Sequence, residues 1–243
     1  MPATSAQIVF TSLTSAFLLV PMWAVAEESA LQASSAAASS EGGWQFASER
    51  EGVSVWFRRF PNSSVNEVRG EAVFEVSAEA LFAVLGDIES YADLMPPTSL
   101  AQRLPGDGSG KRYYIEIDPP VVSRRYYCMD VNLSRQRPDV FVSEWRMWSE
   151  GCVPRKPSLV PMRDNSGRWR LSALAPMKTR VEFQAHMDPG GQIPTWMVNR
   201  TTDGQIAKTF HSLRRASLLP RYAVAAPPKT EQPSVSPVSV KTN

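Results

Sequence analysis

The stretch TRVEFQAHMDPGGQIPTWMVN, residues 179–199, contains an abrupt change of structure. Up to Asp188 apolar and polar residues alternate, which predicts a β-strand with one buried face and one solvated face. Pro189 and the two glycines that follow predict a turn, and Pro194 suits the first turn of a helix. The chain therefore leaves a sheet and begins a helix within a few residues, and the fold depends on what that helix covers.

The helix that starts at Pro194 has one apolar stripe. Its large apolar residues recur near helical spacing and are Trp196, Ile206, Phe210 and Leu213. Asn199 and Asp203 fall on the same stripe. Two interpretations are open: either these polar residues lie in water at the edge of the stripe, or the stripe lines a partly polar cavity.

Upstream of this stretch the sequence predicts one antiparallel sheet. Strands are expected at 52–60, 65–76, 112–117, 124–134, 140–148, 167–174 and 179–187. The segments PNSS and RQRPD predict hairpins between neighbouring strands. Ser77 is a candidate N-cap for a helix that breaks near Gly86 and stops before Pro96. The predicted fold class is therefore α+β.

The two ends differ in composition from the rest. Residues 1–26 have an apolar run followed by Ala24-Val25-Ala26 and are interpreted as a signal peptide, although no Lys or Arg precedes Arg50. An uncleaved anchor or a misassigned start would also explain this. We expect a linker at 27–43, one domain at 44–222 and a disordered tail at 223–243. The net charge of +2 does not require a nucleic-acid partner.

The sequence contains few candidates for catalysis. Its two histidines, His186 and His211, belong to no cluster with metal-ligand spacing, and no glycine-rich phosphate loop is present. Nothing in the sequence points to a Ser-His-Asp set. We therefore expect binding in preference to catalysis, with no cofactor and no metal.

The two cysteines are predicted to be unpaired. If the hairpin turns near residues 135–138, Cys128 faces about residue 145 and Cys152 faces about residue 121. The two residues would then lie roughly 20 Å apart along the strands, too far for a disulfide. Only a chain that bends back after Gly151 would change this.

Several motifs together resemble the START (StAR-related lipid-transfer) family, in its bacterial exported branch. These are PPVVSRR (119–125), VPMRDNSGRWRL (160–171) and the stretch quoted first, with weaker matches in GVSVWFRR and DIESYADLMP. The resemblance covers about 44–218 and implies a helix-grip fold, in which a curved antiparallel sheet wraps around a long C-terminal helix and encloses a cavity. The family pattern has Arg-Asp where this chain has Arg124-Arg125. The proline that the family often places after the VN segment is also missing, because RTTDGQIAKT follows it.

The resemblance implies a binding protein for one hydrophobic molecule, such as a sterol, hopanoid, phospholipid or fatty acid. The candidate ligand-binding residues are Trp145, Met147, Trp169, Phe183, Trp196, Phe210 and Asp130. The alternative for the aromatic residues is a solid core, and the alternative for Asp130 is solvent, because strand alternation places it opposite Tyr127 and Met129. The candidate gate loop consists of Pro119, Pro120, Val121 and Val122.

Two other functions remain open. A polyketide cyclase or aromatase would use the same cavity, and a structural envelope protein would have a solid core. Export favours the lipid-binding function, because a cyclase usually works beside a cytoplasmic carrier protein. We expect a periplasmic or secreted monomer that makes transient membrane contact through its gate loop. The alternative for this loop is a buried tip packed on the helix, with Arg124 and Arg125 solvated.

Overall fold

The structure, a computed structural model, describes residues 43–105, 111–119 and 122–223. The predicted signal peptide, almost all of the predicted linker and tail, and Pro120 and Val121 of the gate loop lie outside the described residues. Within the described part no helix is long and apolar enough to cross a membrane.

The described strands form one sheet of ten strands. In chain order they are β1 (Gln45–Arg50), β2 (Val53–Arg58), β3 (Glu67–Phe74), β4 (Thr98–Arg103), β5 (Lys111–Ile117), β6 (Arg125–Arg137), β7 (Val140–Trp148), β8 (Val160–Pro161), β9 (Asp164–Ala175) and β10 (Lys178–Asp188). In space the order is β1-β2-β3-β10-β9-β7-β6-β5-β4, with antiparallel neighbours. The short β8 pairs with β6 in parallel. The seven predicted strands are confirmed, and β1, β4 and β8 are additional.

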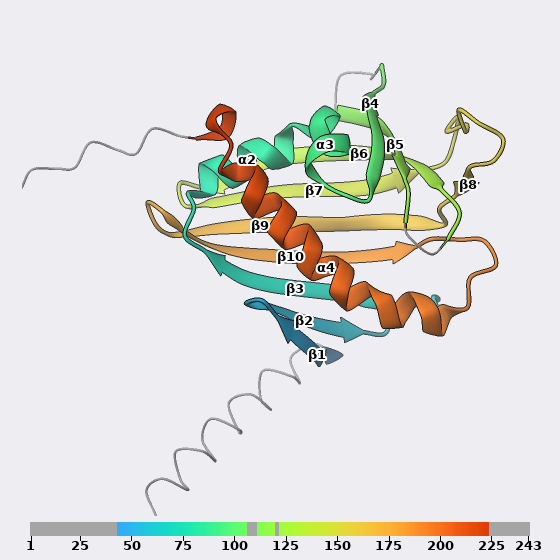
Figure 1. Cartoon of the computed structure of the whole chain (residues 1–243), viewed down its shortest axis with the longest axis horizontal. Helices are drawn as coiled ribbons and strands as arrows, with labels where there is room; N and C mark the ends of the chain where they lie inside the picture. The colour runs from blue at the N-terminus through green and yellow to red at the C-terminus, as the bar shows by residue number, and fades with distance from the viewer. Residues whose placement is uncertain (1–42, 106–110, 120–121, 224–243) are drawn as a thin grey trace, which may run out of the picture. The chain divides into compact units, whose positions relative to one another are not determined.

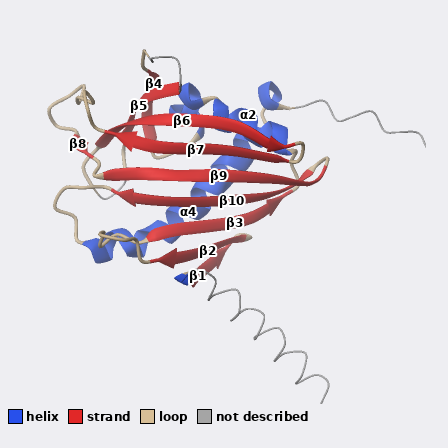
Figure 2. Cartoon of the chain, turned by 180° about the vertical axis from the view of Figure 1, so that it is seen from behind, coloured by secondary structure: helices blue, strands red, loops and turns tan. Residues whose placement is uncertain are grey.

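A long helix, α4 (Thr195–Ser217), crosses one face of the sheet diagonally (Figure 1). We call this the inner face and the opposite one the outer face, which Figure 2 shows with the strands in front of α4. The predicted α+β helix-grip arrangement is therefore confirmed. On β10 the odd-numbered residues Val181, Phe183 and Ala185 face the helix, because alternate side chains of a strand point to opposite faces.

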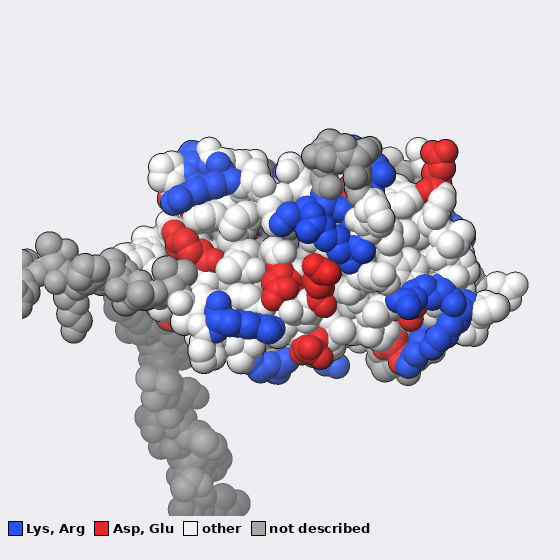
Figure 3. Space-filling model, turned by 90° about the horizontal axis from the view of Figure 1, so that it is seen from above, with Lys and Arg blue, Asp and Glu red and all other residues white. Residues whose placement is uncertain are grey.

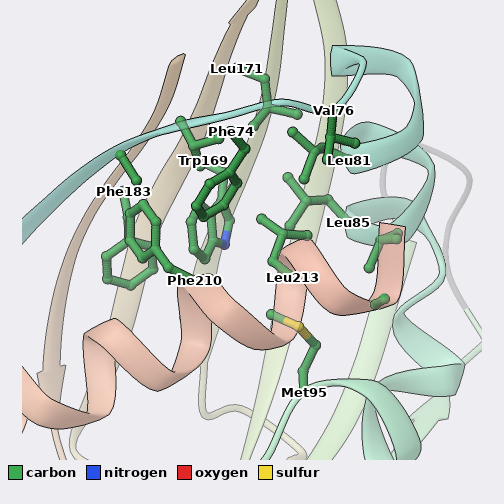
Figure 4. Close-up of a cluster of buried hydrophobic side chains, with 14 of the residues drawn as sticks. Phe74, Val76, Leu81, Leu85, Met95, Trp169, Leu171, Phe183, Phe210 and Leu213 are labelled. Atoms are coloured by element: carbon green, nitrogen blue, oxygen red, sulfur yellow. The ribbon is translucent and has the colours of Figure 1, made fainter. Parts of the chain in front are cut away.

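The helix lies very close to the sheet at Gly70 of β3. A Cβ atom at this position would lie 2.7 Å from Cε2 of Phe210 and 2.9 Å from a methyl carbon of Ile206. Around this contact the buried residues of α4, β3, β9 and α2 form one hydrophobic cluster (Figure 4). A glycine in the middle of a strand thus allows helix and sheet to pack without a gap.

Three short helices cover another part of the inner face. They are α2 (Ala78–Gly86), η2 (Ile88–Ser90) and α3 (Tyr91–Leu94). Ser77 caps α2 as predicted, because its hydroxyl accepts a hydrogen bond from the Ala80 N–H. The break near Gly86 and the stop before Pro96 are confirmed too. A short helix, η3 (Pro220–Tyr222), follows α4. There the Tyr222 hydroxyl donates a hydrogen bond to Asp87 at 2.5 Å.

The prediction of two unpaired thiols is wrong, because Cys128 and Cys152 form a disulfide with a Cα–Cα distance of 5.9 Å. Two features differ from the assumed geometry. The β6–β7 register differs by three residues, so that Cys128 faces Trp148 and not residue 145. The chain then bends back, with Gly151 at φ 73° and the Cys152 N–H donating to the Ser149 carbonyl. This bend lays part of the β7–β9 connection over the outer face, where Leu159 packs with Tyr114 and Tyr126.

Charged side chains of both signs are interspersed on the face seen in Figure 3. No block of one sign dominates this view. The picture agrees with the nearly balanced net charge of +2.

Candidate functional site

The two halves of α4 differ in how they contact the sheet. In the C-terminal half, Ile206, Phe210 and Leu213 are at most 2% exposed. In the N-terminal half, Met197, Val198 and Asn199 are only partly buried. The C-terminal half of the helix is therefore part of the core, and the N-terminal half is not packed to the same extent.

The C-terminal half of α4 packs on a cluster of aromatic side chains that are almost fully buried. Ring centroids of Trp169 and Phe183 lie 4.6 Å apart, and those of Trp169 and Phe210 lie 5.1 Å apart. All three residues are at most 5% exposed. Figure 4 shows them side by side between the sheet and α4. These three predicted ligand-binding residues are thus brought together, but they mainly contact one another.

The predicted position of Trp196 over the sheet is wrong. Its side chain is 64% exposed, because the diagonal path of α4 carries the first turn to the border of the sheet (Figure 1). Further along, Asn199 accepts a hydrogen bond from the Asn66 N–H, and Asp203 accepts from Ser48 and Arg50 of the β1 edge. The polar residues of the stripe therefore lie at its edge and tie the N-terminal half to neighbouring loops and strands.

The inner face opposite this half carries apolar side chains that keep accessible surface. They belong to β5, β6, β7 and β10 and are Ile117, Tyr127, Trp145, Met147 and Met187. Trp145 stacks on Phe183 at 5.7 Å, and the tip of its indole lies against Gly167. Of the predicted ligand-binding residues, Trp145 and Met147 belong to this group.

One buried polar side chain lies among these residues. Asn165 of β9 is 7% exposed, and its Oδ1 accepts the Trp145 indole N–H at 2.9 Å. Burial raises the pKa of Tyr127, and a hydrogen bond from Asn165 opposes this shift only in part. Burial is also the main cause that raises the pKa of Tyr91, whose hydroxyl donates to the Leu85 carbonyl at 3.0 Å. Both tyrosines therefore stay protonated at neutral pH and can donate hydrogen bonds.

The predicted place of Asp130 inside the fold is wrong. It faces Arg146 across the β6–β7 pair, on the outer face, and forms an ion pair with Arg112 at 3.0 Å. Strand alternation explains this, because the neighbouring Met129 and Val131 are buried on the inner face. Tyr127 and Asn165 also lie on the inner face and were not among the predicted ligand-binding residues.

The turn after β10 is held by ionic contacts. Asp188 accepts the Gly190 N–H at 2.9 Å with one oxygen and pairs with Arg163 at 2.9 Å with the other. Arg125 is 3% exposed and donates to the carbonyls of Ser123 and Pro189, and desolvation lowers its pKa. The residue that departs from the family pattern thus anchors the turn from which α4 begins.

Two residues of the predicted gate loop are described. Pro119 and Val122 are partly buried, and the following Arg124 is exposed and pairs with Asp118 at 2.8 Å. Whether the loop acts as a gate stays a prediction.

The outer face carries a hollow of about 730 Å³. Its walls are mostly polar and include Glu67, Asp130, Glu144, Arg146, Arg168, Gln184 and His186. Because these side chains are on the opposite side of the sheet from α4, the hollow is separate from the apolar inner face. Among the described residues no group of His, Cys, Asp and Glu is arranged to hold a metal ion.

The sequence matches the model of one protein family. The model described as polyketide cyclase / dehydrase and lipid transport matches residues 74–211, which is more than half of the chain. The chain belongs to this family. The match runs from the end of β3 into the C-terminal half of α4, so it includes β4 to β10 and most of the helix that covers the inner face.

Two curated relatives of this protein each match more than two thirds of its sequence. An uncharacterised protein of Pseudomonas aeruginosa is 21% identical over 175 residues, covering 72% of this chain and 86% of the relative. START domain-containing protein 10 of Homo sapiens is 23% identical over 184 residues, covering 74% of this chain and 62% of the relative.

Solved structures share the fold. The STAR-related lipid transfer protein of Xanthomonas axonopodis is 25% identical, with a TM-score of 0.64, and covers 72% of this chain and 98% of that one. Human STARD10 is 18% identical, with a TM-score of 0.66, and covers 84% of this chain and 83% of that one. The family member described here therefore has a START-like fold, as its sequence motifs predict.

Proposed function

We propose that the protein binds a single hydrophobic molecule between the N-terminal half of α4 and the inner face of the sheet. The observation that carries this proposal is the difference between the two halves of the helix. Apolar side chains such as Tyr127, Trp145 and Met147 keep accessible surface beside a fully packed core. Apolar surface that is not packed against protein favours an apolar ligand.

The polar groups of this region suit a ligand with one hydroxyl or carboxyl group. The hydroxyl of Tyr127 stays protonated and next to Asn165, so it can donate to an oxygen of the ligand. A sterol, a hopanoid or a fatty acid has such an oxygen at one end of an apolar body. The name of the Xanthomonas relative, a STAR-related lipid transfer protein, supports the same class of ligand.

The test is to purify the protein and identify co-purifying lipid by native and lipid mass spectrometry. Met147→Trp adds bulk to the partly buried inner-face position and should lower occupancy at least about tenfold, because a ligand loses more than about 1.4 kcal/mol of binding free energy. Met177→Trp is the matched control, because Met177 is 48% exposed in the β9–β10 turn. Equal occupancy in the two variants would contradict the proposed location.

The same experiment separates lipid binding from the enzymatic alternative. A cyclase or aromatase would act on a polyketide chain in the same place, and the family description covers both activities. Recovery of an aromatic polyketide in place of a lipid would favour the enzyme.

We further propose that the protein is exported. The apolar segment before Ala24-Val25-Ala26 is the first support, and the Cys128–Cys152 disulfide is the second, because disulfides persist mainly in oxidising compartments. N-terminal sequencing of protein from its native host should give a chain that begins at Glu27. A chain that begins at Met1 and is found in the cytosol would contradict export.

A further inference from the structure

A serine, a histidine and an aspartate meet at one end of the outer face. Nδ1 of His186 lies 2.5 Å from Oδ2 of Asp164, and Nε2 of His186 lies 3.0 Å from Oγ of Ser63. The ring is oriented by a carboxylate on one side and faces a hydroxyl on the other. This is the arrangement by which a histidine activates a serine nucleophile.

The surroundings fix the histidine. His186 is 4% exposed, and its ring stacks on Phe60 with centroids 3.8 Å apart and planes within 9°. An Asp164 oxygen that accepts from Nδ1–H leaves Nε2 of the neutral ring free to accept the Ser63 proton. Ser166 also donates to the same Asp164 oxygen at 3.2 Å, which holds the carboxylate in place.

The serine lies in a constrained turn. Asn62, directly before it, has φ 59°, in the left-handed region that non-glycine residues seldom adopt. The Ser63 hydroxyl accepts the Val65 N–H at 3.1 Å, which sets its orientation, and Ser63 remains partly exposed. Phe60 and His186 also line the outer hollow, so Ser63 is directly beside a space for a substrate.

We propose that Ser63, His186 and Asp164 form a second site, which hydrolyses short-chain carboxylic esters. A short acyl group is expected because charged side chains such as Glu144, Arg146 and Arg168 line the hollow, and a long apolar chain would desolvate them. Ser63 and His186 are the catalytic residues, and Asp164 is a positioning residue. The site is on the opposite face from the proposed lipid, so either proposal can fail alone.

The reaction uses only the ester and water. Ser63 Oγ attacks the carbonyl carbon while its proton passes to Nε2 of His186. The bond from the carbonyl carbon to the alcohol oxygen breaks, and His186 returns the proton to that oxygen. Water then attacks the acyl-serine through the same base, so that the acyl–Oγ bond breaks, the acid leaves and Ser63 regains its proton.

The test is covalent labelling with a fluorophosphonate probe, followed by peptide mass spectrometry of the folded protein. In this reaction Oγ displaces fluoride from phosphorus, and the adduct should map to Ser63. Hydrolysis of 4-nitrophenyl acetate should fall at least about 100-fold in Ser63→Ala and His186→Gln, the range expected for loss of a nucleophile or its base. Thermal melting checks that each variant is folded.

Ser54→Ala is the matched control. Ser54 lies on the same face, with its hydroxyl 3.4 Å from Glu49. The probe should therefore not label Ser54, and the substitution should leave ester hydrolysis unchanged. Asp164→Asn should lower kcat with little change in KM, and Asp164→Glu should restore part of the activity. Absence of a Ser63 adduct in wild-type protein would overturn the proposal, and so would undiminished hydrolysis in Ser63→Ala.

Discussion

The two halves of α4 have different neighbours although they belong to one continuous helix. The C-terminal half meets Gly70 and the aromatic cluster of Trp169 and Phe183, and its apolar residues are almost fully buried. The N-terminal half is held by polar contacts at its edge, from Asn199 and Asp203. One half therefore stabilises the fold, and the other can separate from the sheet at a lower cost in free energy.

This difference has a functional consequence. Local opening is easiest where few apolar side chains are buried and where the remaining contacts are polar and partly solvated. A ligand held under the N-terminal half could then enter without disturbing the core. Four substitutions test the comparison, in order of expected effect.

The largest effect is expected from removing the central aromatic side chain of the packed half. Phe210→Ala should lower the free energy of unfolding by about 3–5 kcal/mol, because it deletes a fully buried ring. Trp196→Ala, in the exposed first turn, should change it by less than about 0.5 kcal/mol. Urea unfolding of the two variants measures this, and equal losses would remove the distinction between the halves.

The next effect concerns the close approach of helix and sheet. Gly70→Val should destabilise the protein by about 1–3 kcal/mol, because its side chain would overlap Phe210 and Ile206. Gly204→Ala is the control, because a Cβ atom there meets nothing within 4 Å and alanine favours a helix by about 0.5–1 kcal/mol. A neutral Gly70→Val would show that the helix is not tightly packed on β3.

A smaller loss of stability is expected from the contact between Tyr222, which follows the packed half of α4, and Asp87. Desolvation raises the pKa of Asp87, but hydrogen bonds from Tyr222 and Ser90 and the nearby Arg221 outweigh it, so that the pKa is lowered from 3.8. A lowered pKa in the folded state stabilises the protein above pH 3.8, and this contribution is lost as the pH falls through the folded-state value. Tyr222→Phe should therefore cost about 0.5–1.5 kcal/mol at neutral pH.

A comparison at two pH values is the control for Tyr222→Phe. Urea unfolding at neutral pH and below pH 3.8 should give a difference between wild type and Tyr222→Phe that shrinks in acid. A difference that is the same at both pH values would show that the hydrogen bond to Asp87 is not its cause.

The smallest change in stability is expected at the polar edge of α4. Asp203→Asn weakens the contact with Arg50, which is 58% exposed, so the free energy of unfolding should fall by less than about 1 kcal/mol. Amide hydrogen exchange should nevertheless accelerate in residues 196–204 and stay unchanged in 206–216. Uniform acceleration along the helix would contradict independent opening of its first half.

The sequence predicts the local part of this structure well. Alternation identified the central strands, because a period of two is a property of each strand alone. It missed β1 and β4, whose sequences QFASER and TSLAQR carry little apolar signal at the two edges of the sheet. The same alternation places Asp130 opposite the apolar face, where the structure has it, and predicts its position better than the family pattern does.

The remaining errors concern contacts between distant parts of the chain. Cys128 and Cys152 are brought together by the bend at Gly151, which the strand register does not predict. The spacing of Trp196 fits a helical stripe, but it does not reveal where the helix leaves the sheet. Ser63 and Asp164 lie far from His186 in sequence, and only strand pairing and the β2–β3 loop bring the three together.

The central claim is that a ligand lies under the N-terminal half of α4 and not within the packed core. Photolabelling with a diazirine-bearing fatty acid, followed by peptide mapping, tests it directly. We predict adducts on peptides that contain Tyr127, Met147, Met187 and Met197, with labelling reduced by an excess of unmodified fatty acid. Adducts confined to the packed residues Leu171 and Leu213, or to the outer face, would contradict the claim.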